Sequence, residues 1–485
     1  MAKDSSQFGP GTAVIYLFNL VVGTGVLALP SVLISGGWLL GGIFISIVAF
    51  LSYVSLTFVV EAMAATNALL EYEKEPVKVP TGNVSANAFQ TTIQTDNGVK
   101  QPLLNTNKSI AEKDIFEINQ RIEFGQMAGR YYTRMGMIVF FSILIVYIYG
   151  DGVIYSTVVV RSLLSFIYGA EEPVWAFSLF LCIFFIFILP FCFFDFQKTK
   201  VLQMITMVIR NVSLLTILIL AFRAALQKDH VVREVPPTRF GALPNLFGGA
   251  VYSFMCHHSI PGIITPIANK KSIMKITGIV FGLIFVIYIA LFIGCLLAFG
   301  ADVLDPVTFN FPPQVYGFIG DALILFPVFT LSSNFPMMLI TLRNNLDTLF
   351  MLMTKGAGSK SSQDDKGDLA WQRRIVLTLI AVAPPIVCAF IAEHFGLSVD
   401  SLVGTSGAFA GCIIMFIFPA TFVYIARRDV KNTIENCKAP LKYHTTTNAY
   451  ASPFKGTIWV CVLMGWALIA MIFNAVEKLA VLYYH

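Results

Sequence analysis

Charged residues are scarce in this sequence. Only 13% of the 485 residues are Asp, Glu, Lys or Arg, whereas 56% are hydrophobic and the mean hydropathy is +0.74. Soluble domains contain about 25% charged residues, so this composition excludes a soluble fold and indicates a membrane protein. The net charge of +5 comes mostly from loops between apolar segments, where the expected partner is the anionic lipid of the bilayer rather than nucleic acid.

Signals for disulfides and for catalysis are also missing. All cysteines except Cys437 lie in apolar segments, so no disulfide framework is indicated. The sequence has no phosphate-binding glycine loop, no cluster of metal ligands and no nucleophile–base motif. It therefore predicts no enzyme, no cofactor and no metal centre.

Long apolar runs, by contrast, make up most of the chain. A membrane-spanning helix needs about 20 largely apolar residues, and about eleven segments meet this requirement. They are residues 11–33, 37–62, 135–167, 174–195, 200–222, 245–267, 275–300, 318–342, 374–393, 397–425 and 457–482. The sequence therefore predicts an all-α polytopic membrane protein.

The loops between these segments give the expected orientation. Most of the 33 Lys and Arg residues fall in alternate loops, and loops rich in these residues stay on the cytosolic side. We therefore expect a cytosolic N-terminus and, because the number of spans is odd, an extracellular or luminal C-terminus. An endolysosomal membrane and the plasma membrane are both open.

One loop, residues 63–134, is long enough to carry structure or partners of its own. Its polar stretch 73–113 has few large apolar residues and is predicted to be disordered. Residues 114–132 have apolar side chains near helical spacing, which predicts a short interfacial helix. Cytosolic partners of this loop are conceivable.

Two of the apolar segments are interrupted at membrane depth, by Gly23-Thr24-Gly25 and by the run from Cys256 to Gly262. Backbone at this depth must be hydrogen-bonded within its own helix, so a break persists only around a cavity or a binding site. Two broken spans in corresponding places of two halves indicate the binding site of a secondary transporter.

The two breaks also suggest a repeat. Five spans in residues 11–222 and five in residues 245–425 each begin with a broken helix, and because five is odd the second set has inverted topology. The prediction is a single transporter domain with a five-plus-five inverted repeat, discontinuous first and sixth helices, and residues 457–482 as an added eleventh helix.

Several stretches resemble a known transporter family. GTGVLALP (23–30), followed by Gly36-Gly37-Trp38, resembles the amino acid/auxin permease family of the amino acid-polyamine-organocation superfamily, over nearly the whole chain. FVVEAMAATNA (58–68), EFGQMAG (123–129) and YIYGDGVIY (147–155) resemble a narrower branch, the transmembrane protein 104 family. The broad resemblance implies a fold like that of bacterial amino acid symporters and transport of small amino acids coupled to sodium or protons. Two adjacent histidines in the second break depart from the family pattern.

The first break is a candidate site for a carboxylate. Gly23, Thr24 and Gly25 let the backbone leave the helix, and the free N–H groups at the start of the second half-helix suit an anion. The alternative is a packing hinge, since small residues also let helices approach closely.

The second break is a candidate site for an ammonium group. Pro261 removes a backbone donor, and the carbonyls freed upstream could receive a cation. The candidate substrate-binding residues here are Cys256, His257, His258 and Ser259. At least one histidine could gate the site, contact substrate or take up a proton. The alternative is two neutral histidines bonded to neighbouring helices. The sequence does not show which of the two histidines would have the direct role.

Asp151 and Arg210 lie in the middle of the third and fifth spans, where a lone charge costs about 3 kcal/mol. They could form a structural charge pair. Alternatively, Asp151 accepts a proton and Arg210 occupies the place of a sodium ion, as a lysine does in some proton-coupled relatives of the resembled fold.

A sodium site is the competing interpretation. In sodium-coupled members of the resembled fold, hydroxyls on the eighth span bind the ion, and here Thr330, Ser332 and Ser333 could do so. Hydroxyls in membrane helices usually bond their own backbone instead.

The leading hypothesis is a secondary active transporter of amino acids or similar small zwitterions, coupled to H⁺ or Na⁺. The alternative is a membrane nutrient sensor that binds an amino acid without net transport and recruits cytosolic partners through residues 63–134.

Overall fold

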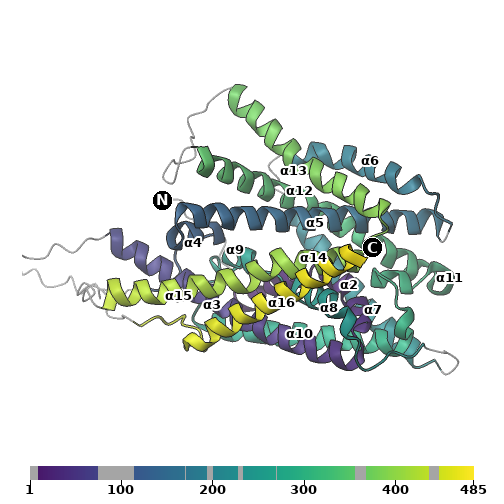
Figure 1. Ribbon diagram of the computed structural model, residues 1–485, viewed down its shortest axis with the longest axis horizontal. Coiled ribbons are helices and arrows are strands. Elements are labelled where there is room, and N and C mark those ends of the chain that lie inside the picture. Colours follow the sequence, from purple (N-terminus) through teal and green to yellow (C-terminus); the bar gives the residue numbers. More distant parts are fainter. Residues whose placement is uncertain are drawn as a thin grey trace, which may run out of the picture.

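The computed structural model describes residues 9–74, 114–169, 171–193, 200–227, 233–268, 270–354, 368–435 and 447–484. Within these ranges the chain forms helices and no strands, which confirms the all-α class. The stretch 73–113, predicted to be disordered, lies almost wholly outside the described residues. The long helices run roughly along the longest axis of the bundle (Figure 1).

Eight helices in the described part are long and apolar enough to cross a membrane, and a bent pair makes a ninth. The unbroken ones are α3 (Trp38–Lys74), α5 (Arg134–Tyr168), α7 (Lys200–Ala225), α10 (Ile273–Phe299), α12 (Phe318–Thr354), α13 (Asp368–His394) and α16 (Thr457–Tyr484). The eighth runs from α14 (Val399–Ser406) through π-helical turns to α15 (Phe418–Val430). The multi-pass character is confirmed, and the count of eleven spans stays a prediction.

The predicted spans 174–195 and 245–267 are the two that fall short of this length. The first forms α6 (Ala176–Ile188), which continues as a 3₁₀ turn through Cys192. The second is divided into α8 (Leu243–Ser253), the 3₁₀ turn η4 (His257–Ser259) and α9 (Ile260–Ile264).

The predicted break in the first span is present. α1 (Pro10–Val21) and α2 (Gly25–Ser35) are bent by 57° relative to each other. The discontinuous first and sixth helices therefore lie where the inverted repeat requires them. Pro261 falls in the first turn of α9 rather than inside a helix, a position where its missing N–H leaves no hydrogen bond unmade.

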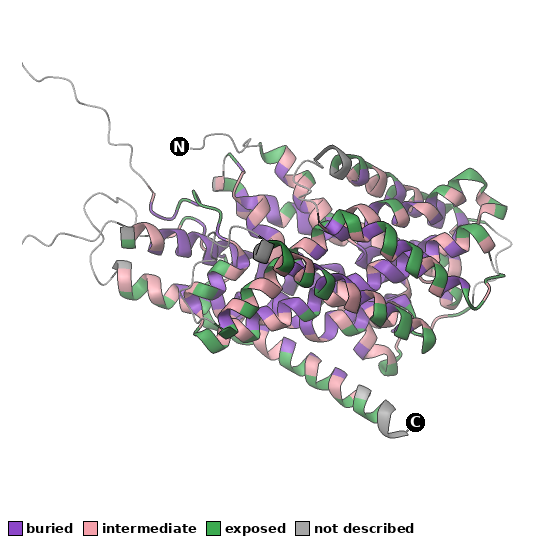
Figure 2. Ribbon diagram, turned by 90° about the horizontal axis from the view of Figure 1, so that it is seen from above, coloured by how far each residue is buried: buried purple, intermediate pink, exposed green. Residues whose placement is uncertain are grey.

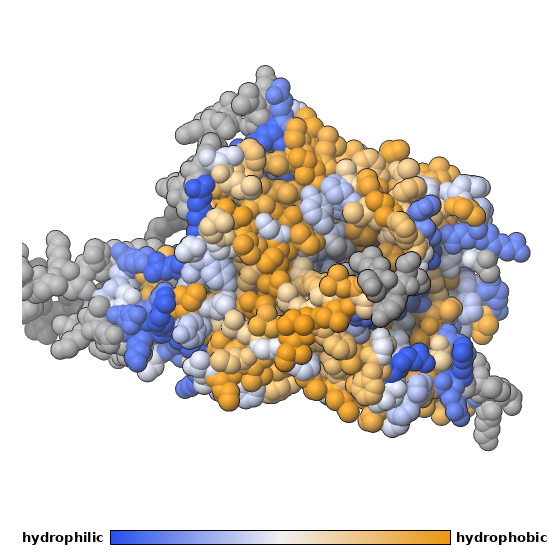
Figure 3. All heavy atoms as spheres, in the orientation of Figure 1, coloured by the Kyte–Doolittle hydropathy of each residue, from blue (hydrophilic) through white to orange (hydrophobic). Residues whose placement is uncertain are grey.

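Buried residues fill the interior along the whole length of the bundle, and exposed ones lie outside (Figure 2). The visible face carries a broad apolar band between two polar ends (Figure 3). Many large hydrophobic side chains are exposed, among them Ile186, Val286 and Ile469. In a bilayer these side chains face lipid, so the band agrees with a membrane-embedded chain.

Glycines bring the broken sixth span against the tenth. A Cβ placed on Gly248 of α8 would lie 1.7 Å from the carbonyl oxygen of Gly404, and one on Gly407 would lie 1.9 Å from that of Gly248. Such backbone contact requires residues without side chains, as is common where membrane helices cross. These glycines hold α8 in place.

The interfacial helix predicted over residues 114–132 is shorter than expected. Only α4 (Phe124–Tyr131) is helical, and it begins after Glu123, whose N–H donates to Gln126 Oε1 at 2.9 Å. The apolar residues before it, including Ile115 and Ile118, are buried in a non-helical segment. Their near-helical spacing was therefore misleading, because burial in an irregular segment needs no helical period.

Charged contacts anchor the end of the bundle near α4. Arg427 of α15 donates to both oxygens of Glu61 in α3, each at 2.8 Å, and to the carbonyl of Phe454 at 3.2 Å. Glu61 also accepts the N–H of Ser452 at 2.9 Å. These bonds join α3, α15 and the segment that leads into α16.

Other contacts join elements at the opposite end. Arg161 of α5 pairs with Glu393 of α13 at 2.8 Å. The loop after α10 carries Asp305 and continues through η7 (Val307–Asn310) and α11 (Pro313–Tyr316) to α12. The N–H of Asp400 donates to Asp305 Oδ2 at 2.5 Å, which ties this loop to the start of α14.

Candidate functional site

Both broken spans line one cavity, which we call the inner cavity. Its volume is about 270 Å³, just below the range of about 300–1,000 Å³ typical of ligand pockets. Polar or aromatic lining residues come from both breaks and from α5. They are Thr24, Tyr147, Asp151, Tyr155, Tyr252, His258 and Ser259, and α12 adds Thr341. Gly23, Gly25 and Cys256 also line it, so six of the seven predicted binding residues meet here.

The start of α2 is open toward the inner cavity. No side chain caps its first turn, and the Thr24 hydroxyl is instead bonded to that of Tyr252 at 3.0 Å. Gly25 lies against α8, where Ser253 Oγ donates to its carbonyl at 3.2 Å. The free N–H groups and the positive end of the α2 dipole therefore face a cavity wall, the arrangement that attracts anions.

The structure separates the two adjacent histidines. His257 is fully buried, its Nε2 lies 3.2 Å from the carbonyl of Ser52 in α3, and it does not line the inner cavity. The His258 ring faces the cavity, 5.7 Å from the ring of Tyr147, and its Nδ1 has no hydrogen-bond partner. The residue available to a ligand is His258, whereas His257 packs the break against α3.

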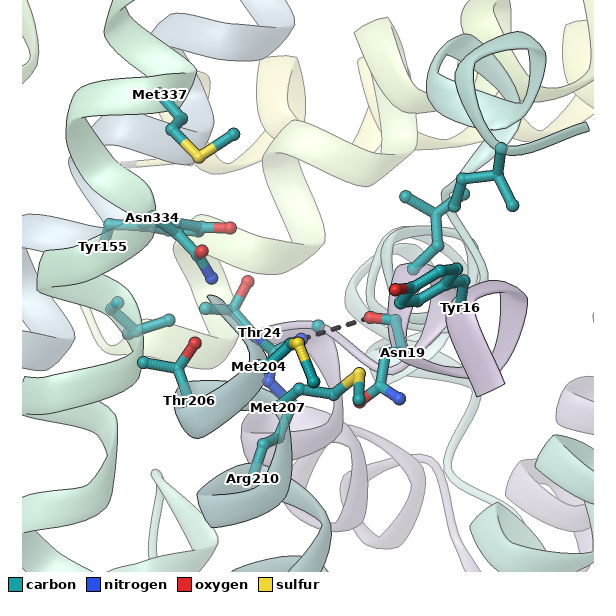
Figure 4. A pocket seen from close by; sticks show the side chains of 14 residues that line it. Tyr16, Asn19, Thr24, Tyr155, Met204, Thr206, Met207, Arg210, Asn334 and Met337 are labelled. Carbon is teal, nitrogen blue, oxygen red and sulfur yellow. Dashed lines mark hydrogen bonds between the residues drawn. The ribbon is translucent and has the colours of Figure 1, made fainter. Parts of the chain in front are cut away.

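Arg210 satisfies the end of α1. Its Nη1 donates to the carbonyl oxygens of Asn19 and Val22, at 3.2 and 2.9 Å. These carbonyls have no partner within the helix because α1 ends at the break, and a cation there also meets the negative end of the helix dipole. Figure 4 shows Arg210 reaching toward Asn19 beneath Thr24. The guanidinium thus occupies a position that would suit a bound cation.

Asp151 does not pair with Arg210. No ion pair within 4 Å joins the two described residues, and Asp151 Oδ1 is buried without a hydrogen-bond partner. The side chains of Tyr147 and Tyr252 lie against the Asp151 carboxylate. The structural charge pair that the sequence allowed is therefore not formed in this conformation.

The hydroxyls of the eighth span mostly bond to their own helix. Thr330 Oγ1 donates to the carbonyl of Phe326 at 2.9 Å, and Ser333 Oγ donates to that of Thr330 at 3.0 Å. Neither these two residues nor Ser332 line the inner cavity. The backbone bonding that was the alternative to a sodium site is thus present for Thr330 and Ser333.

Two further cavities continue from the inner one. The side cavity, about 450 Å³, shares Gly23, Thr24 and Tyr155 with it and reaches Arg210 and Asn334 (Figure 4). The vestibule, about 770 Å³, shares His258, Ser259 and Thr341 with it. Arg121, Gln126, Asn344, Asn345 and Thr348 give the vestibule a polar wall near α4. The vestibule therefore extends from the second break toward residues near α4.

Sequence reasoning missed the tyrosines. Tyr147 and Tyr155 lie four residues before and after Asp151, so one face of α5 presents all three side chains. That spacing is legible in the sequence and could have identified them. Tyr252 carries no such signal, because only the packing of α8 against α2 brings it to the cavity, beside Tyr147.

Comparison with known proteins identifies the family of this chain. The family described as "Transmembrane amino acid transporter protein" matches residues 6–75 and 106–473. Transmembrane protein 104 of Mus musculus is 33% identical over 98% of this chain and 97% of its own length. The Transmembrane protein 104 homologs of Dictyostelium discoideum and Drosophila melanogaster are 32% and 30% identical, over 97% and 94% of this chain and the same shares of their own lengths.

Among solved structures, a crystal structure of the Eremococcus coleocola manganese transporter is similar at 12% identity with a TM-score of 0.45, over 98% of this chain and 97% of that one. The sequence matches decide the family: the chain belongs to the transmembrane amino acid transporter family and is a membrane transporter by that membership.

Proposed function

We propose that this member of the family is a secondary active transporter of amino acids or similar small zwitterions, and that the inner cavity binds the substrate. The proposal is based on one observation. The uncapped start of α2 and the buried carboxylate of Asp151 line the same cavity, which both broken spans form. Such a cavity offers donors for a carboxylate and an acceptor for an ammonium group. Discontinuous helices lining a midplane cavity are the form that transporter sites take.

We propose protons as the coupling ion. The α1 carbonyls that could bind sodium already accept hydrogen bonds from Arg210, and Thr330 and Ser333 bond to their own helix. Proton coupling needs a titratable group in the cavity, and Asp151 is the carboxyl group among the described residues that line the inner and side cavities. Arginine is not a candidate because it does not deprotonate in proteins.

The test is a substrate screen with purified protein in proteoliposomes, with pH and sodium gradients imposed separately. We expect uptake of at least one amino acid that responds to the pH gradient and not to sodium. A response to sodium alone would contradict the coupling proposal. Binding without flux would contradict transport and identify a sensor.

We also propose that the α4 end is cytosolic, because the basic loops predict it. The vestibule would then open to the cytosol, and the loop that carries Asp305 would lie outside or in a lumen. A tag inserted after Gly356 should be cytosolic, and a tag at the C-terminus should be extracellular or luminal. Protease protection in sealed vesicles measures both, and both tags on one side would contradict this topology.

A further inference from the structure

The Asp151 carboxylate has no counter-charge. It lies in the middle of α5 and lines the inner cavity, its Oδ1 accepts no hydrogen bond, and no described Lys or Arg pairs with it. A carboxylate at membrane depth without a partner is costly, and such residues generally pair with another charge or mark a binding site. A proton or a cationic ligand must neutralise it during the transport cycle.

The walls around Asp151 favour a cation. The Tyr147 and Tyr252 rings, 6.3 Å apart, lie beside the carboxylate, and Tyr155 follows on the next turn of α5. Tyrosine hydroxyls can donate to a carboxylate without neutralising its charge, and tyrosine ring faces attract cations. Carboxylate and rings together make a negative subsite.

The cation that fits is an organic ammonium group. The described residues include no cluster of three or more His, Cys, Asp or Glu that could hold a metal ion, and a single carboxylate balances a single positive charge. The same cavity, about 270 Å³, is lined by Thr24 and Gly25 at the start of α2. A ligand that fills both subsites is small and carries an ammonium and a carboxylate.

We infer that Asp151 binds the ammonium group of the substrate directly, within a cage formed by Tyr147, Tyr155 and Tyr252, while the start of α2 holds the substrate carboxylate. The inference rests on the proposed function and deepens it. The substrate class is small amino acids with a free, protonated amine, and N-acylated amino acids and 2-hydroxy acids are excluded.

The same arrangement ties substrate binding to protons. Protonated Asp151 cannot pair with an ammonium group, so proton and substrate compete for one carboxylate and substrate binding displaces the proton. The titratable or charged groups that face Asp151 are Tyr147 and Tyr155 on its own helix, Tyr252, Cys256 and His258 in the sixth span, and Arg210 beyond Tyr155 on α7. Arg210 is held by the α1 carbonyls and stays positive throughout.

The first experiment uses the wild-type full chain in lipid nanodiscs. The twenty L-amino acids are screened by thermal shift, and calorimetry then compares each hit with the 2-hydroxy acid that has a hydroxyl in place of its ammonium group. We expect the 2-hydroxy acid to bind at least tenfold more weakly, because it leaves the buried carboxylate unpaired. Equal affinity for the two would overturn the inference. Binding of no amino acid would overturn the proposed function itself.

The second experiment repeats both measurements with Asp151→Asn and, as a matched control, Asp321→Asn at the start of α12 outside the cavities. We expect Asp151→Asn to lose at least tenfold in affinity for the amino acid and little for the 2-hydroxy acid, which isolates the contact between the two groups. Affinity should fall with decreasing pH in the wild type and not in Asp151→Asn.

An equal loss for both ligands in Asp151→Asn would show that Asp151 does not contact the ammonium group and would overturn the inference. If Asp151→Asn does not fold, the comparison of the two ligands on the wild-type protein decides the question alone. The Asp321→Asn control should bind both ligands as the wild type does, and a matching loss there would also count against a specific contact.

Discussion

The crossing of α2 and α8 depends on glycines on both half-helices, and Gly25 is the one that meets backbone. A Cβ added to Gly25 would lie 2.7 Å from Ser253 Cα, 3.0 Å from its Oγ and 3.1 Å from its backbone nitrogen. Carbon atoms in good contact are about 3.5–4.0 Å apart, so Gly25→Ala forces the two half-helices apart by about 1 Å. Because the obstacle is backbone, rotation of a side chain cannot relieve the contact.

We expect Gly25→Ala to lower the free energy of unfolding by about 1–3 kcal/mol, the usual cost of inserting a methyl group into a packed site. It should also reduce amino acid uptake, because the start of α2 moves relative to Tyr252. Gly23 supplies the matched control. A Cβ there meets only the Val21 carbonyl oxygen, at 3.9 Å, and Gly23 has no positive φ. Gly23→Ala should therefore be neutral or stabilising by about 0.4–1 kcal/mol, through the unfolded chain.

The assay is thermal unfolding of the two purified variants in the same detergent, together with initial uptake rates in proteoliposomes at matched protein levels. The two glycines are two residues apart, so differences in expression or membrane insertion should be small. Equal melting temperatures for the two variants would refute the packing argument. Wild-type uptake by a destabilised Gly25→Ala would refute the placement of the substrate at this crossing.

Three further outcomes follow from contacts elsewhere. Arg210→Gln removes charge-assisted bonds worth about 1.5–3 kcal/mol each from the end of α1, so initial uptake at matched abundance should fall at least tenfold. Glu61→Gln leaves Arg427 with a neutral partner and should destabilise the protein by about 1–3 kcal/mol in thermal unfolding, less than for a fully buried pair because Arg427 is 25% exposed. Burial and the nearby Asp400 raise the pKa of Asp305 to about 8 from 3.8, so the folded protein keeps a proton that the unfolded chain has released between these values. Stability should therefore fall as pH rises through this window, and Asp305→Asn should flatten the dependence.

The breaks were predictable from sequence because their causes are local. Glycines at positions 23 and 25, and the polar run that ends in Pro261, interrupt apolar segments, and no other signal is needed. The exact ends of the helices could not be predicted from the local sequence alone. The helix α8 already ends at Ser253, and the carbonyl of Ser253 accepts a hydrogen bond from the Tyr288 hydroxyl of α10 at 3.1 Å. A bond across more than thirty residues has no counterpart in the local pattern.

The roles of the two histidines and of Arg210 could not be read from the sequence. Adjacent residues in a turn face different directions, and only the position of the Ser52 carbonyl on α3 shows that His257 points away from the cavity. Opposite charges at similar depth suggested that Arg210 pairs with Asp151. The acceptors are instead the backbone carbonyls of Asn19 and Val22. Because every residue has a backbone carbonyl, the residue types in the sequence do not reveal such a partner.

The separation of these two charges determines what the inner cavity can bind. Had Asp151 and Arg210 formed an ion pair, each would neutralise the other, and an amino acid would have to displace one partner to gain a charged contact. The broken α1 provides a different partner for Arg210, because a helix that ends inside the membrane exposes carbonyls that need donors. The break therefore has two effects: it opens the start of α2 to an anion, and its free carbonyls bind Arg210. Asp151 then remains the charge available to a substrate, and a zwitterion can bind without breaking a pre-existing pair.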